Sequence, residues 1–157
     1  MWKRIQFDKT STQNPRRTNQ MIYVLDASVI LKWFLEEPET AEAISYKSRY
    51  EIGEIDIVEP DLLIYELANV LRYKKYFPEI AVKTAVRSLY DLGIKFITPT
   101  FSLMENAVHI ALKTNLSVYD CVYCSLAMKL SSPLITADRK LYLNIKPYTS
   151  VKILSGF

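Results

Sequence analysis

The stretch Tyr23-Val24-Leu25-Asp26-Ala27-Ser28 decides how the rest of the chain is expected to fold. Residues 22–25 are apolar and rich in β-branched and aromatic types, which predicts a buried strand. The strand ends at Asp26, and the amphipathic residues 29–35 follow after two small residues. In open α/β sheets ligands bind beyond the carboxyl ends of the strands, so Asp26 lies where a site is expected. Its alternative role is to cap the following helix.

The same pattern of strand followed by helix continues along the chain. Because strands alternate with helices, the sequence predicts an α/β protein with a central, mainly parallel sheet covered by helices on both faces. Strands are predicted at 22–26, 55–59, 94–98, 134–136 and 151–154, and helices at 28–36, 39–50, 60–76, 78–92, 101–114, 118–130 and 138–143.

The composition is that of one globular domain. A length of 157 residues fits the usual ~100–200 residues per domain, and a 50% share of hydrophobic residues permits a sizeable core. Three glycines and 24% charged residues argue against a disordered or fibrous chain. No run approaches the ~18 apolar residues of a membrane span, and the start lacks a signal-peptide core. We therefore expect a cytoplasmic protein without a membrane partner.

The net charge of +3 is concentrated at the start of the chain. Residues 1–20 are polar, carry five basic residues against one acid, and show no helical or strand period. We predict that 1–20 is a basic, disordered extension and that 21–157 is the folded domain. A basic extension could also contact nucleic acid or another acidic partner.

Glu66 stands out because it is an acid among apolar neighbours. In a helix from Pro60, the residues three and four positions from it are Leu62, Leu63, Asn69 and Val70, mostly an apolar stripe. An unpaired buried charge costs several kcal/mol, so such an acid is expected either to bind a metal or to pair with a cation such as Arg72.

Asp120 and Asp138 complete a set of four unusually placed acids. Asp120 lies in the first turn of a helix that is apolar almost all round and therefore internal, with Ser117 as its cap candidate. Asp138 follows the short strand 134–136, the second strand to be followed by an acid. Taken singly, Asp120 could stabilise the helix dipole and Asp138 could cap a helix.

Taken together, the four acids point to a divalent-ion site. No cluster of cations is available to neutralise them, and hard oxygen ligands select Mg²⁺ or Mn²⁺. Cys121 and Cys124 lie in one predicted buried helix and are expected to be core residues rather than zinc ligands or a disulfide framework. His109, the only histidine, is predicted to be on the surface, which gives little support to His-based mechanisms.

Four segments of the chain resemble a PIN-domain ribonuclease, most closely the single-domain VapC-type toxins of prokaryotic toxin–antitoxin pairs. These segments are Val24-Leu25-Asp26-Ala27-Ser28, residues 60–71 around Glu66, Tyr119-Asp120-Cys121 and residues 133–138. The resemblance covers about Met21 to Leu154. The resemblance rests on four acids in the order Asp, Glu, Asp and Asp, each flanked by apolar residues.

The resemblance implies a three-layer α/β/α sandwich whose acids bind Mg²⁺ or Mn²⁺ and cut RNA. It also implies a homodimer and a small antitoxin that covers the acidic groove. The resemblance implies that Asp26, Glu66, Asp120 and Asp138 are the catalytic, metal-binding residues. Ser28 orients Asp26 or a metal water, and Thr136 acts likewise near Asp138. Asn144 lies where some relatives place a further acid, so a fifth carboxylate is in doubt.

Three other functions remain open. The chain could be a housekeeping RNA-processing nuclease of the same fold, or a non-catalytic binding module with a degenerate metal site. An aspartyl-phosphate enzyme using Asp26 is a third alternative. Haloacid-dehalogenase-like phosphatases want a second Asp two residues on, where this chain has Ser28.

Overall fold

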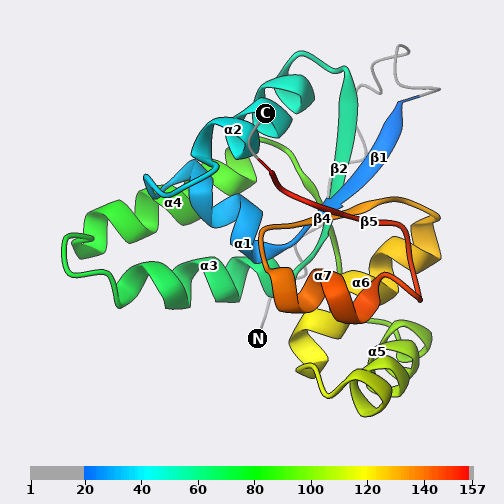
Figure 1. The fold of residues 1–157 in the computed structure, drawn as a ribbon. Helices are drawn as coiled ribbons and strands as arrows, with labels where there is room; N and C mark the ends of the chain where they lie inside the picture. The colour runs from blue at the N-terminus through cyan, green and yellow to red at the C-terminus, as the bar shows by residue number, and fades with distance from the viewer. Residues whose placement is uncertain (1–19, 156–157) are drawn as a thin grey trace, which may run out of the picture.

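The computed structural model describes residues 20–155, and the predicted extension 1–20 falls almost entirely outside them (Figure 1). The predicted alternation of strands and helices is confirmed. The strands are β1 (Met21–Leu25), β2 (Ile55–Pro60), β3 (Lys95–Ile97), β4 (Leu134–Thr136) and β5 (Val151–Ile153). The helices are α1 (Ala27–Ile30), η1 (Leu31–Trp33), α2 (Thr40–Glu51), α3 (Leu62–Arg72), α4 (Glu79–Asp91), α5 (Phe101–Thr114), α6 (Val118–Leu130) and α7 (Arg139–Ile145).

The five strands form one parallel sheet in the order β3-β2-β1-β4-β5. The chain runs outward from β1 through β2 to β3, and then continues on the other side of β1 with β4 and β5. The direction of winding thus reverses between β1 and β4, and such a crevice beyond the carboxyl ends of the strands is where doubly wound folds bind ligands. Asp26 directly follows β1, and Thr136 is the last residue of β4.

Helices cover the sheet on both sides, as the three-layer prediction requires (Figure 1). Helix α6 packs on β1, β2 and β4, and α5 packs against its outer side. Helices α3 and α4 form a pair that projects from the other side of the molecule in Figure 1, with α1 in contact with α3. The three strands flanked on both sides, β2, β1 and β4, have fully buried apolar residues at Ile57, Val24, Leu25, Leu134 and Ile135.

Helix α6 is internal, as predicted from its apolar sequence. All seven residues from Cys121 to Ala127 are buried. Cys121 and Cys124 are free, buried thiols rather than a disulfide. Because α6 is enclosed by the sheet and by α5, residues at its exposed N-terminal end, including Asp120, are held on a rigid support.

Two helix predictions were wrong in extent. The predicted helix 28–36 is a single turn, α1, followed by η1, which ends at Trp33; Trp33 Nε1 donates to the carbonyl oxygen of Ala43 of α2 at 2.9 Å. The predicted helix 60–76 begins at Leu62 and ends at Arg72. After Arg72 the backbone closes into tight turns, with Lys74 N donating to Leu71 O and Phe77 N to Lys74 O. Pro78 disfavours a helical conformation at Phe77, so these turns do not run on as a helix into α4.

Within residues 20–155, none of the helices has the length and apolar character needed to cross a bilayer. His109 lies on the exposed side of α5, as predicted.

Candidate metal and active site

Asp26 is a buried carboxylate held at the end of β1. Its side chain is 6% exposed, and its backbone N–H donates to Ile135 O of β4 at 2.8 Å. The carbonyl oxygen of Asp26 accepts the N–H groups of Val29 and Ile30, so the residue occupies the N-cap position of α1. Its carboxylate, however, makes no cap hydrogen bond. The capping alternative therefore explains the position of the backbone of Asp26 but not the burial of its side chain.

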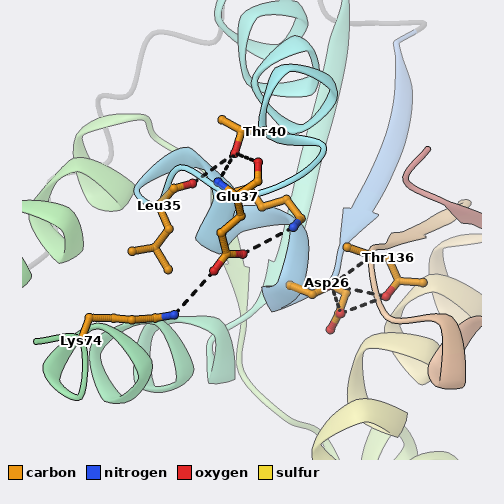
Figure 2. Close-up of polar contacts among 9 residues, drawn as sticks. Asp26, Leu35, Glu37, Thr40, Lys74 and Thr136 are labelled. Atoms are coloured by element: carbon orange, nitrogen blue, oxygen red, sulfur yellow. Dashed lines mark hydrogen bonds and ion pairs between the residues drawn. The ribbon is translucent and has the colours of Figure 1, made fainter. Parts of the chain in front are cut away.

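Two hydroxyl groups orient the Asp26 carboxylate. Ser28 Oγ donates to Asp26 Oδ2 at 2.6 Å. Thr136 Oγ1 donates to the same oxygen at 3.0 Å, and Figure 2 shows Thr136 beside Asp26. Each hydroxyl is fixed in turn by a backbone donor: Ala137 N to Ser28 Oγ at 3.0 Å and Asp138 N to Thr136 Oγ1 at 2.9 Å. Burial raises the pKa of Asp26, the two hydroxyl bonds oppose that shift, and the charge of Asp120 adds to it.

Glu66 projects from α3 and is bound by Tyr123 of α6. The buried Tyr123 hydroxyl donates to Glu66 Oε2 at 2.5 Å. Burial raises the pKa of Glu66 to about 7, and the charges of Asp26 and Asp120 also raise it, against the Tyr123 hydrogen bond. No cation of residues 20–155 forms an ion pair with Glu66, so the alternative pairing with Arg72 is not present.

Asp120 lies in the first turn of α6 and is only partly buried. Ser117 caps the helix as predicted, since its Oγ accepts Asp120 N at 3.1 Å, and the same hydroxyl donates to Asp120 Oδ2 at 2.6 Å. Because its charge contributes to the raised pKa of both Asp26 and Glu66, Asp120 belongs electrostatically to one group with them.

Asp138 lies at the edge of this group. It is exposed, and its Oδ1 accepts Leu141 N at 3.0 Å, which makes it the N-cap of α7. Its connection to Asp26 runs through Thr136, whose hydroxyl accepts Asp138 N and donates to Asp26. The capping alternative for Asp138 thus describes its observed hydrogen bond.

We expect Asp138→Ala to lower the free energy of unfolding by about 1 kcal/mol, because the α7 cap is lost. Urea denaturation measures this loss. Asp138→Asn retains a cap oxygen and should unfold within a few tenths of a kcal/mol of the wild type. Equal stability of the alanine variant and the wild type would show that the cap bond contributes nothing.

Glu59 was not identified from the sequence, yet it is fully buried beside Asp26. Its Oε1 accepts Leu25 N at 2.8 Å, and its Oε2 has no hydrogen-bond partner among residues 20–155. Burial raises the pKa of Glu59 well above its usual range, and the charge of Asp26 raises it further. The strand's period of two was the available signal, because Glu59 follows Ile55 and Ile57 on the same buried face.

We expect Glu59→Gln to become more stable than the wild type as the pH rises. Because the pKa of Glu59 is raised in the folded state, that state keeps a proton which the unfolded chain releases above about pH 4.5. The wild type therefore loses stability from pH 5 upward, and glutamine, which keeps an acceptor for Leu25 N, removes this loss. Thermal melts at pH 5 and pH 8 should show a difference that grows with pH, with Glu105→Gln, an exposed change, as control. A pH-independent difference would contradict the assignment.

Lys32 and Lys74 pair with a carboxylate that is not one of the candidate acids. Glu37, which follows η1, forms an ion pair with Lys32 at 3.4 Å and another with Lys74 at 3.5 Å. The backbone N–H of Glu37 donates to Thr40 Oγ1 at 3.0 Å. Figure 2 shows this Glu37 cluster as a group separate from Asp26 and Thr136. None of the ion pairs within residues 20–155 includes Asp26, Glu66 or Asp120, so no cation of these residues neutralises the three acids.

The donor set fits a hard divalent ion. Across residues 20–155 no group of three or more His, Cys, Asp and Glu side chains lies close enough together to cage a metal ion. Mg²⁺ does not need such a cage, because it retains several waters and is commonly held by one or two carboxylates. Asp26 and Asp120 can supply these carboxylates, and the mutual repulsion of the three acids favours a cation between them.

Comparison with known proteins identifies the family and the fold of the chain. The family model for the PIN domain matches residues 23–144. Ribonuclease VapC3 of Pyrobaculum aerophilum is 27% identical over 125 residues, which are 77% of this chain and 92% of that protein. VapBC2 from Rickettsia felis bound to a promoter DNA fragment has a TM-score of 0.65 at 12% identity, over 85% of this chain and 98% of that one. A toxin–antitoxin complex from Klebsiella pneumoniae has a TM-score of 0.63 at 14% identity, over 86% and 99%. These two structures share the fold.

Proposed function

Because the chain belongs to the PIN domain family, we propose that it is a Mg²⁺- or Mn²⁺-dependent endoribonuclease and the toxin of a type II toxin–antitoxin module. One observation carries the proposal. Asp26, Glu66 and Asp120 come from three separate elements, influence one another electrostatically, and form no ion pair among the described residues. The related ribonuclease VapC3 supports RNA as the substrate.

The four acids have different roles in this proposal. Asp26 and Asp120 would hold the metal ion, Glu66 would bind it or orient the attacking water, and Asp138 would be an outer ligand. A divalent ion in such a site lowers the pKa of water and stabilises the charge that develops at the phosphate during in-line displacement. Ser28 and Thr136 keep Asp26 in one orientation, since both hydroxyls donate to the same carboxylate oxygen.

Glu66 is suited to hold or accept a proton. Its pKa of about 7 is close to the value at which a general base is most effective near neutral pH. Tyr123 engages only Oε2, and Oε1 makes no hydrogen bond with another residue of the described chain. That oxygen is available to an ion or to the water that attacks phosphorus.

A small antitoxin and a second copy of the chain are the proposed protein partners. The solved relatives include toxin–antitoxin complexes, and this supports the first partner. An acidic site without its own cations also suits a partner segment that brings a basic side chain. Copurification with the product of a neighbouring short gene, and the mass of the free chain in solution, test the two partners.

Cleavage of a fluorescent single-stranded RNA tests the activity. The purified chain should cut it with Mg²⁺ or Mn²⁺ and lose the activity in EDTA. Cleavage that is unaffected by EDTA would contradict the metal-dependent mechanism. Divalent-ion binding without any RNA turnover would favour the non-catalytic module instead, and trapping of an acyl phosphate on Asp26 would favour the aspartyl-phosphate enzyme.

A further inference from the structure

An apolar cavity opens between the first turns of α3, α5 and α6, at the end of β3. Its volume is about 200 Å³, and we call it the slot; its lining includes Tyr65, Tyr119, Leu103, Met104, Val122 and Asp61. Drug-sized ligands occupy pockets of roughly 300–1,000 Å³, so the slot suits a single planar ring system. Leu103 and Val122 are buried and form part of its rigid apolar lining.

Two exposed tyrosines stand at the mouth of the slot. Tyr65 is 72% exposed and Tyr119 is 63% exposed, and neither hydroxyl has a hydrogen-bond partner in the described part of the chain. Tyr65 directly precedes Glu66 on α3, and Tyr119 directly precedes Asp120 on α6. Neither of these acids lines the slot itself, but Glu66 lines the larger cavity that shares Tyr65 and Tyr119 with it.

A larger cavity of about 810 Å³ continues from the slot along α3. It shares Leu62, Tyr65 and Tyr119 with the slot and extends past Glu66 and Asn69 to Arg72. Arg72 lies six residues beyond Glu66, about 9 Å along the helix at ~1.5 Å per residue. Arg72 forms no ion pair with a carboxylate of residues 20–155.

The tyrosine rings, the acids and the Arg72 guanidinium follow one another along the two cavities, as bases and phosphates do along a single-stranded polynucleotide. Aromatic rings suit a base, the acids with a divalent ion suit the phosphodiester that is cut, and a guanidinium suits a further phosphate. We propose that the slot binds one unpaired nucleobase of the RNA, stacked against Tyr65 and Tyr119, next to the phosphodiester that is cleaved. This inference rests on the proposed nuclease function and adds a substrate subsite to it.

Asp61 gives the slot a chemical preference. It is the only charged side chain of the lining, and its carboxylate makes no hydrogen bond or ion pair with the described residues. A carboxylate accepts hydrogen bonds and donates none, so it favours bases with an exocyclic amino group, as cytosine has, over uracil. Asp61→Asn can also donate, and it should reduce this discrimination.

The test combines protein variants with modified RNA. Tyr65→Ala and Tyr119→Ala should each lower kcat/KM for a short single-stranded RNA by about 10- to 100-fold, mainly through KM, because a stacking partner is lost. Tyr65→Phe and Tyr119→Phe keep the ring and should remain within about twofold of the wild type. Tyr90→Ala, an exposed tyrosine on α4 outside both cavities, is the matched control.

An abasic nucleotide beside the cleaved bond gives an independent arm. It should reduce cleavage by the wild type as much as Tyr65→Ala does, and it should cause little further loss in that variant.

If the RNA is cut but the abasic nucleotide has no effect, the slot assignment is wrong while the nuclease function stands. If no RNA is cut under any condition, the nuclease function fails, and RNA binding by the tyrosine variants, followed by fluorescence anisotropy, still decides the slot. Unchanged RNA binding together with an altered oligomeric mass or antitoxin affinity would make the slot a protein interface and overturn the proposal.

Discussion

Asp26→Asn is expected to reduce RNA cleavage at least about 100-fold while the protein remains folded. A divalent ion contributes several kcal/mol of charge stabilisation in the transition state, and each ~1.36 kcal/mol is a factor of ten in rate. Asn removes the negative charge that holds the ion but retains an oxygen that can accept from Ser28 Oγ and Thr136 Oγ1, which now donate to Asp26 Oδ2. Fluorescent RNA cleavage at saturating Mn²⁺ measures the effect.

The stability of Asp26→Asn shows whether a loss of cleavage comes from the site or from unfolding of the protein. Burial already raises the pKa of Asp26, so a neutral side chain should be tolerated there, and the Tm should equal or exceed that of the wild type. Asp91→Asn, an exposed change at the end of α4, serves as control and should leave cleavage unaltered. Wild-type cleavage by Asp26→Asn would remove Asp26 from the mechanism.

Asp120→Asn is expected to raise the Mn²⁺ concentration for half-maximal cleavage by roughly tenfold or more. Loss of outer partners of metal ligands commonly costs ~10–100-fold in affinity, and loss of a ligand charge should cost no less. Ser117 Oγ still caps α6 through the backbone N–H of residue 120, so the helix should be unaffected. A Mn²⁺ titration of the cleavage rate after EDTA treatment measures the shift.

The comparison with Asp138→Asn tests whether the acids are equivalent. Asp138 is exposed and caps α7, so its loss should change the Mn²⁺ requirement less than the loss of Asp120. An unchanged Mn²⁺ requirement in Asp120→Asn, or a larger shift in Asp138→Asn, would contradict the ranking of the four acids.

The order of strands and helices could be predicted because local patterns control it. The apolar run before Asp26, the cap at Ser117 and the continuous apolar face of α6 were sufficient for their elements. The end of the first predicted helix could not be found locally. Trp33, the last residue of η1, donates to Ala43 O of α2, a contact between two separate elements that no local pattern shows.

The candidate site was predictable only in part, for the same physical reason. Acids at strand ends and on apolar helix faces can be recognised from the sequence alone, and these features identified Asp26 and Glu66. The partners that orient them are distant in sequence, as the bonds from Thr136 to Asp26 and from Tyr123 to Glu66 show. Glu59 was missed because its strand carries two acids, Asp56 and Glu59, and an acid at the end of a short strand resembles an exposed position although the period of two places Glu59 on the buried face.

Direct binding of Mn²⁺ tests the central claim, that Asp26, Glu66 and Asp120 form one divalent-ion site. Electron paramagnetic resonance of free Mn²⁺, titrated into the apoprotein without RNA, counts bound ions independently of activity. The account predicts saturable binding to the wild type and to Asp91→Asn, and an affinity at least tenfold weaker for Asp26→Asn and Asp120→Asn. Equal Mn²⁺ affinity in the wild type and in a variant that carries both substitutions would contradict it.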